Sequence, residues 1–470
     1  MRREIHSFIN MEVNALNVVM IGASRSGKTS ILASMLEQVT CSVLGDYFYI
    51  EDKSEYCYKV SDKRASEVSL SENVDAMKDL LNPQLNEGKI QPRLAELTGT
   101  TAPFTYDITV QSKTDKWKVE KEVLHVKFTD VKGESFAKRG REFDEIEKII
   151  KQSQVLLVAV DVPALMYAKE KKKSGLNRYM NLPYELITAT NMLAQDYNDP
   201  DLKRMVAFIP IKCEYWMHHN KMEEVYSQIE EVYKTPLVSL ANGKNVRVMI
   251  MPMETIGGLE FSHYSDDDNS FLMIYGESRE NRSNSDKFIE EDYIGGNGIV
   301  RCEKVSENKV RIKNGAIYTL HPSDKLILAK ERGKYPYVYN EGDKAIAIPF
   351  FWFIPTGKGY TPKYCDQALF QVLKFAIECV EKQRENESQE NLTIIDENPN
   401  LFKTIWNLVK EGVKLLWKNL LQRFGFQSEE QYLKFSSNIK CMMNEGLISE
   451  EHIRFLINKE NGVDLLDVKI

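Results

Sequence analysis

The chain has 470 residues, a formal net charge of -7 and a hydrophobic fraction of 43%. This length and composition predict a globular protein of one enlarged domain or two to three domains, and they exclude a disordered polypeptide. The acidic balance gives no general attraction to nucleic acid or to an anionic membrane, so neither is an expected partner.

The cysteines and the apolar runs bear on the cellular compartment of the protein and on whether it spans a membrane. The 7 cysteines are scattered, and no two of them form a C-x-x-C pair, which argues against a disulfide framework or a zinc site. No apolar run reaches the ~18–20 residues that a membrane span needs, and residues 1–10 lack the apolar centre of a signal peptide. We therefore expect a soluble, cytoplasmic protein without a membrane span.

The segment from Gly22 to Thr29 fits the pattern G-x-x-x-x-G-K-[ST]. It follows the apolar run 16–21 and precedes a helical apolar stripe, so it predicts a strand, a phosphate loop and a helix. The glycines let successive backbone N–H groups face phosphate oxygens. Lys28 is expected to reach the β- and γ-phosphates, and Thr29 to ligate Mg²⁺. The residues expected to bind nucleotide here are Gly22, Ser24, Arg25, Ser26, Gly27, Lys28, Thr29 and Ser30.

The next chemical signal lies after a stretch, 41–98, that predicts an insertion with a hairpin at 46–58. Alternating residues at 104–110 and 122–128 then predict an antiparallel pair of strands. The second strand leads to Asp130, with Gly133 three residues further on. This arrangement suits an acid linked to Mg²⁺ and a backbone N–H that senses a γ-phosphate.

These motifs resemble the P-loop GTPases of the Ras-like and translation-factor (TRAFAC) class, in which Asp130-x-x-Gly133 matches the D-x-x-G box. The resemblance implies that Asp130 holds Mg²⁺ through water and that the Gly133 N–H contacts the γ-phosphate. It also implies a Thr that closes on the metal. Thr101 is preferred for that role, Thr100 is nearly as good, and both could instead be plain turn residues.

Two residues near the expected γ-phosphate bear on hydrolysis. Glu134 stands where many of these GTPases have a water-orienting Gln, and a carboxylate there is repelled by the phosphate unless it is protonated or turned away. We therefore expect hydrolysis that is slow or that uses another residue, with Lys28, Glu134 and Thr101 as candidate catalytic residues. Arg25 either supplies positive charge to the transition state or points to solvent.

Apolar runs at 154–160 and 205–210 predict two further buried strands. The second runs into Ile211-Lys212-Cys213-Glu214, where the family has its N-K-x-D guanine box. The resemblance implies that the Lys212 stem packs over the base and that Glu214 accepts from the guanine N1–H and amine. Ile211 cannot make the contacts of the usual Asn. A strand at 245–251 and the turn 252–258 suit the last base-side box.

The second half of the chain predicts a β-rich insertion at 261–345 and an amphipathic helix that ends at Val380. That helix resembles the closing helix of enlarged bacterial GTPases of conflict or stress loci. A charged linker is expected at 381–398. The region 399–470 is expected to be helical, with an apolar stripe at 401–421 and helices at 432–443 and 450–458. This region either packs on the core or binds a protein partner or a second copy.

Taken together, the sequence predicts a three-layer α/β domain at 14–380 with a mostly parallel sheet, insertions at 41–98 and 261–345, and a helical C-terminal module. The predicted function is that of a GTP-binding and GTP-hydrolysing switch, with GTP and Mg²⁺ as cofactors. Regulation by a protein partner or by self-association through the C-terminal helices is expected. The alternatives are a P-loop ATPase or kinase, and a nucleotide-binding pseudo-GTPase scaffold.

Overall fold

The computed structural model of the chain describes residues 15–23, 26–52, 74–75, 78, 104–115, 118–119, 124–132, 141–171, 177, 181, 183, 186, 188–190, 203–241, 245–264, 270–274, 299–312, 317–320, 325–328, 338–341, 344–347, 351–355, 358–397, 418, 421–422, 424–459 and 462–467. It divides into two compact units. The first comprises Met1–Met166, Met180–Glu260 and Ile354–Ile470, and the second comprises Tyr167–Tyr179 and Phe261–Phe353.

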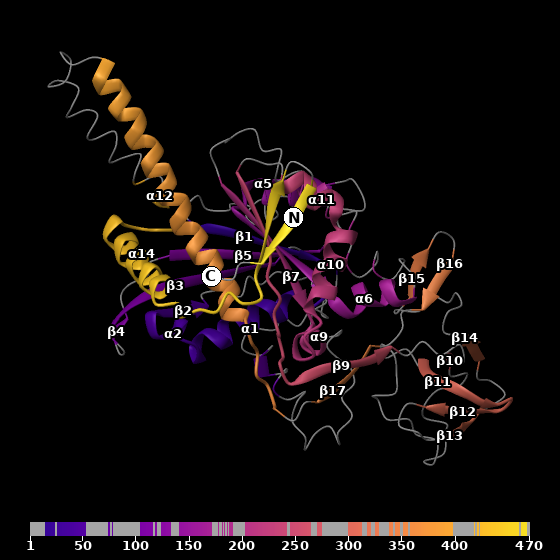
Figure 1. Cartoon of the computed structure of the whole chain (residues 1–470). Helices are drawn as coiled ribbons and strands as arrows, with labels where there is room; N and C mark the ends of the chain where they lie inside the picture. The colour runs from indigo at the N-terminus through magenta and orange to yellow at the C-terminus, as the bar shows by residue number, and fades with distance from the viewer. Residues whose placement is uncertain are drawn as a thin grey trace, which may run out of the picture. The chain divides into compact units, whose positions relative to one another are not determined.

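The first unit is built on a 10-stranded mixed sheet with a parallel centre (Figure 1). Its central strands are parallel neighbours in the order β8 (Val246–Ile250), β7 (Arg204–Ile211), β6 (Val155–Asp161), β1 (Leu16–Gly22) and β5 (Leu124–Lys132). Every residue of β1, β6 and β7 is buried. Strands buried on both faces read as continuous apolar runs, which is why the sequence predicts these three well.

Antiparallel strands extend the sheet at both sides. β3 (Phe104–Asp115) pairs with β5, as the alternation predicts, and β2 (Phe48–Asp52) pairs with β3. β2 covers the first half of the hairpin expected at 46–58, and residues 53–58 lie outside the described residues. The short β4 (Lys118–Val119) pairs with β3 off the main path.

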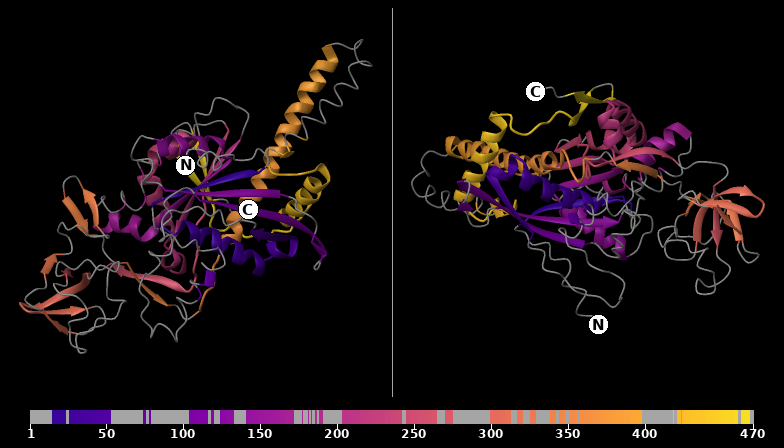
Figure 2. Two further views of the ribbon diagram at one scale, coloured as in Figure 1. Left: turned by 180° about the vertical axis from the view of Figure 1, so that it is seen from behind. Right: turned by 90° about the horizontal axis from the view of Figure 1, so that it is seen from below.

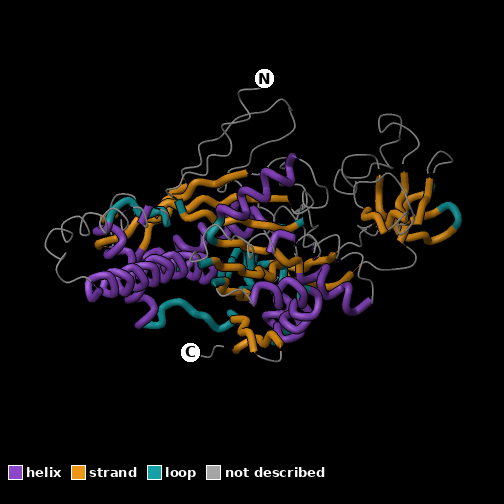
Figure 3. The backbone as a smooth tube through the Cα atoms, turned by 90° about the horizontal axis from the view of Figure 1, so that it is seen from above, coloured by secondary structure: helices purple, strands orange, loops and turns teal. Residues whose placement is uncertain are grey.

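Helices pack along this sheet (Figure 3). α1 (Lys28–Cys41) buries the predicted stripe, and the N-terminal part of α12 (Cys365–Glu397) lies against it. The Gln38 side chain of α1 accepts from the backbone N–H of Cys365 at 2.7 Å, which caps α12. The other helices among the described residues are α2 (Leu44–Tyr47), α5 (Arg141–Gln152), α6 (Val162–Lys171), α9 (Glu214–His218), α10 (Met222–Val232), α11 (Lys234–Ala241) and α14 (Glu429–Asn444).

α12 is longer than expected. It continues from Val380 to Glu397, through most of the segment predicted as a linker, and its C-terminal half projects beyond the sheet (Figures 1 and 2). The segment is rich in Glu, Lys, Gln and Arg, which are good helix formers even where they are solvated. A charged segment that directly follows a helix is therefore a poor indication of a flexible linker.

The C-terminal region is only partly helical, which corrects the expected module. The helix predicted at 450–458 is wrong, because β18 (Arg454–Lys459) and β19 (Gly462–Asp467) form a hairpin there, and β18 pairs with β8. Asn461-Gly462 is a hairpin turn signal that outweighs the weak helical period of this short apolar run. Most of the apolar stripe at 401–421 lies outside the described residues.

α14 packs on the edge of the sheet formed by β2 and β3. Its Phe435 ring lies 4.8 Å from that of Phe48 on β2 and 5.4 Å from that of Phe426, and all three are fully buried. Gly425 (φ +84°) allows this approach, because a Cβ there would lie 2.4 Å from the His125 carbonyl oxygen of β5. The apolar face of α14 is thus used by the core, although Leu433 and Met443 stay exposed.

The second unit is β-rich, as predicted for the insertion. Its 5-stranded antiparallel sheet has the order β13 (Ile317–Thr319), β12 (Lys309–Ile312), β11 (Ile299–Ser306), β10 (Ser270–Ile274) and β14 (Lys325–Leu328). β10 lies near the start of this predicted insertion. Two strand pairs accompany the sheet, β15 (Val338–Glu341) with β16 (Lys344–Ala347), and β9 (Leu259–Tyr264) with β17 (Phe351–Pro355).

Candidate functional site

The loop between β1 and α1 is tightly folded around the end of β1. A Cβ at Gly22 would lie 2.9 Å from Ser26 Oγ and 3.1 Å from Ala159 Cβ. Gly27 has a φ of +103°, which L side chains rarely adopt, and α1 begins at the next residue. Both glycines are therefore required by the backbone, as the phosphate-loop pattern predicts. Ser24 and Arg25 lie outside the described residues.

Lys28 turns its side chain back over this loop. Its Nζ donates to the carbonyl oxygens of Gly22 and Ala23, both at 3.0 Å, and lies 3.6 Å from Asp130 Oδ1. The Lys28 and Asp130 side chains are only 6% and 7% exposed. A buried ammonium at the C-terminal end of a parallel strand, facing the start of a helix, is suited to an anionic ligand.

Asp130 and Thr29 come from neighbouring elements beside the loop. Asp130 pairs with Met20 of β1 and with Phe104 of β3 in register, and Thr29 is the second residue of α1. Both side chains are buried, and Ser26 Oγ is buried without a hydrogen-bond partner among the described residues. A hydroxyl and a carboxylate are the oxygen ligands that Mg²⁺ takes beside phosphates, so these residues fit that ion.

Other expected residues on the phosphate side cannot be placed. Thr100, Thr101, Gly133 and Glu134 lie outside the described residues, so their predicted roles stay predictions. Ser30, on the first turn of α1, is partly exposed.

The strand β7 carries the predicted base-side tetrapeptide to the same edge of the sheet. A Cβ at Gly27 would lie 3.0 Å from Ile211 Cδ1, so the Ile211 side chain rests against the phosphate loop. Lys212 follows with a φ of +57°, a left-handed backbone that costs a non-glycine residue about 1 kcal/mol. Its Nζ forms an ion pair with Asp161 Oδ2 at the end of β6.

Glu214 opens α9 and is 2% exposed. Burial raises its pKa to about 7, and the charge of Glu254 adds to this effect. The backbone N–H of Gly257 donates to Glu214 Oε1 at 3.4 Å. The carboxyl group is therefore held at the loop that follows β8, and it changes charge near neutral pH.

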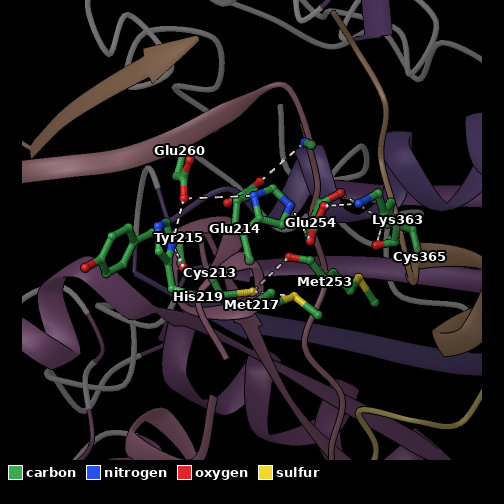
Figure 4. Close-up of polar contacts among 12 residues, drawn as sticks. Cys213, Glu214, Tyr215, Met217, His219, Met253, Glu254, Glu260, Lys363 and Cys365 are labelled. Atoms are coloured by element: carbon green, nitrogen blue, oxygen red, sulfur yellow. Dashed lines mark hydrogen bonds and ion pairs between the residues drawn. The ribbon is translucent and has the colours of Figure 1, made fainter. Parts of the chain in front are cut away.

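Glu254 is a buried carboxylate beside Glu214 (Figure 4). It is paired with His218 Nε2 at 3.2 Å and with Lys363 Nζ at 3.5 Å. The backbones of Glu254 and Lys363 also exchange two hydrogen bonds, of 3.0 and 3.1 Å. The segment before α12 thereby fixes the loop that carries Gly257.

Sequence reasoning missed Asp161 and Glu254 as parts of this site. Asp161 ends an apolar strand, and carboxyl ends of parallel strands meet at the ligand edge of a sheet, so its position was a usable signal. Glu254 had no such signal, because its partners lie about 36 and 109 residues away in sequence and only the fold brings them together.

No protein-family model matches the sequence, and no curated protein matches it. Solved structures with some likeness include a chain of the signal recognition particle receptor SRb-GTP/SRX complex from Chaetomium thermophilum, at 12% identity and a TM-score of 0.28, covering 52% of this chain and 92% of that one. Another is the S. cerevisiae Ski7 GTPase-like domain bound to GTP, at 11% identity and a TM-score of 0.27, covering 77% of this chain and 95% of that one. Both TM-scores are too low to support an inference about this chain.

Within the described part of the chain, no helix combines the length and apolar character needed to cross a membrane.

Proposed function

We propose that this protein binds GTP together with Mg²⁺ and hydrolyses the bond between its β- and γ-phosphates. The observation that carries the proposal is the placement of Lys28 Nζ, 3.0 Å from two carbonyl oxygens of the phosphate loop and 3.6 Å from Asp130. This places the ammonium at the loop that we propose holds the phosphates, where a phosphate oxygen would replace one of its present contacts. The carboxyl of Glu214, at the start of α9 and three residues after the end of β7, is the proposed partner of the base.

Each part of the nucleotide has a proposed partner in this chain. The loop residues Gly22, Ser24, Arg25, Ser26 and Gly27 surround the phosphates with Lys28, and Ser30 follows on α1. Thr29 and Asp130 hold Mg²⁺, which when bound neutralises charge on the β- and γ-phosphates. Thr101 is a third candidate for the metal side, since it lies three residues before Phe104, the partner of Asp130 in the sheet.

The choice of base rests on Glu214 and Lys212. An ionised Glu214 accepts hydrogen bonds from the N1–H and amine of guanine, which adenine cannot donate in the same pattern. The Lys212 stem is proposed to lie against the base. A P-loop ATPase or kinase is the competing function, because Ile211 makes no polar contact with a base.

A competition experiment tests this proposal. Labelled Mg·GTP should bind the wild-type protein, unlabelled GTP should displace it, and ATP should compete at least about tenfold more weakly because it lacks the donors for Glu214. Equal or tighter competition by ATP would favour the ATPase. Binding with no phosphate release over hours would favour a pseudo-GTPase scaffold, and no binding of either nucleotide would overturn the proposal.

Hydrolysis is proposed to be slow and assisted, with Glu134 orienting the attacking water. We expect Glu134→Ala to abolish measurable turnover and Glu134→Gln to raise kcat at least about tenfold, because Gln orients water without repelling the γ-phosphate. Phosphate release under single-turnover conditions measures both variants, and GTP affinity within about twofold of wild type shows that the site is intact. Wild-type rates in both variants would leave Glu134 without this role.

Assistance is proposed to come from a protein partner or from a second copy through the C-terminal region, where α14 leaves Leu433 and Met443 exposed. In that case the turnover per molecule rises with protein concentration for self-association, or only on addition of a partner. The segments near Thr101 and Gly133 would then be ordered by the γ-phosphate and released after hydrolysis.

A further inference from the structure

Asp161 is a fully buried carboxylate at the ligand edge of the sheet, with both oxygens engaged. Oδ1 accepts from the backbone N–H of Ala164 at 3.0 Å and so caps α6, and Oδ2 accepts from Lys212 Nζ. A buried carboxylate is stable only when it is paired and hydrogen-bonded, and these contacts meet that need.

The backbone of Asp161 is held as firmly as its side chain. Asn181 accepts from the Asp161 N–H through Oδ1 at 2.7 Å and donates from Nδ2 to the Asp161 carbonyl at 3.1 Å. The backbone carbonyl of Asn181 in turn accepts from the Tyr233 hydroxyl at 3.1 Å. Asn181 and Tyr233 are both fully buried, so Asp161 is a fixed point in the core.

Through its contact with Asp161, Lys212 connects this buried cluster to the segment 211–214, which carries the proposed base-side residues. It is flanked by Ile211, which rests against Gly27, and it lies two residues before Glu214. Its left-handed backbone is strained, while its side chain is 18% exposed. The ion pair with Asp161 therefore holds a strained residue in place between the phosphate loop and the buried Glu214.

A purely structural ion pair explains this arrangement less well. Replacing a buried ion pair with apolar residues is often neutral or stabilising, so a pair that also maintains backbone strain gains nothing for the fold alone. Strain of this kind persists where the surroundings fix a residue for binding.

We propose that Asp161 is a positioning residue for nucleoside recognition, which orients Lys212 and the following Glu214 toward the base. The inference rests on the proposed function, since it assumes a nucleoside triphosphate at this edge. It predicts that loss of the Asp161 charge weakens contacts with the base and leaves the contacts of the phosphates with Lys28 unchanged.

The test is a double-mutant cycle on Mg·GTP affinity, measured by calorimetry. Asp161→Asn keeps an oxygen that caps α6 but removes the charge, and it should weaken binding about tenfold. Lys212→Met should weaken binding to a similar extent, and the double variant should be no worse than Lys212→Met alone. The inhibition constant of Mg·tripolyphosphate, which has no base, should change less than about twofold in Asp161→Asn.

Controls separate this role from a structural one. Asp144→Asn, at an exposed position on α5, should leave GTP affinity unchanged. If Asp161→Asn does not fold, Asp161→Ser takes its place, because Ser also caps a helix. Additive effects in the cycle, or equal losses for GTP and tripolyphosphate, would overturn the inference while the proposed function stands. A wild-type protein that binds no nucleotide would overturn both.

Discussion

Replacement of Lys28 with Met should weaken Mg·GTP binding by at least about a hundredfold. Met fills the same space in the loop, but it removes an ammonium whose charge-assisted hydrogen bonds to phosphate contribute ~1.5–3 kcal/mol each. The remaining loop N–H groups cannot supply that charge. Titration with a labelled, non-hydrolysable GTP analogue measures the effect directly.

The variant needs a control for the fold, because Lys28 is also the buried partner of Asp130 at 3.6 Å. Lys28→Met leaves the Asp130 carboxylate without this cation, and the unfolding temperature should fall. In the double variant Lys28→Met/Asp130→Asn the temperature should recover, whereas GTP binding should stay lost. Lys148→Met, at an exposed position on α5, should change neither quantity. Tight GTP binding by a folded Lys28→Met protein would contradict the assignment of the phosphate loop.

The conformation of the loop between β1 and α1 could be predicted from sequence because most of its determinants are local. Gly27 has a positive φ, Gly22 lies close to Ser26 four residues later, and the flanking strand and helix carry clear periods. The strands β6 and β7 could also be predicted, because strands buried on both faces have continuous apolar sequences. The residues of Ile211 to Glu214 could be located for the same reason, since they follow β7.

The parts that sequence reasoning missed depend on distant partners. β18 is a strand because β8 and β19 supply its hydrogen bonds, and its own short apolar run is compatible with a helix as well. The pKa of Glu214 depends on its burial and on Glu254, which lies 40 residues further along the chain and which only the folded chain brings beside it. A sequence motif can predict that Glu214 lies near the base, but the pKa of its carboxyl group depends on burial in the folded chain.

GTP affinity should rise with pH between about 6 and 8, because Glu214 must be ionised to accept from guanine. Its pKa of about 7 means that roughly a tenth of the protein is in the ionised form at pH 6 and most of it at pH 8, so affinity should rise about tenfold. The triphosphate also titrates, so the measurement is the ratio of GTP to ATP affinity, in which that effect cancels. Glu214→Gln should lower GTP affinity at pH 8 and make the ratio independent of pH.

The buried Glu214 should also lower the stability of the folded protein at high pH. Glu214→Gln should therefore raise stability, although it lowers GTP affinity. Because the folded-state pKa lies above 4.5, the ordinary value of a glutamate, the folded protein retains a proton that the unfolded chain loses. Stability from this source therefore falls as pH rises from about 4.5 through 7. The loss at pH 8 is on the order of 3 kcal/mol. Glu214→Gln should therefore unfold at a higher denaturant concentration than wild type at pH 8, with little difference near pH 4.5. A variant that is more stable yet binds GTP more weakly would show that Glu214 serves ligand binding at the expense of stability. A destabilised variant with wild-type affinity would show that Glu214 is an ordinary core residue.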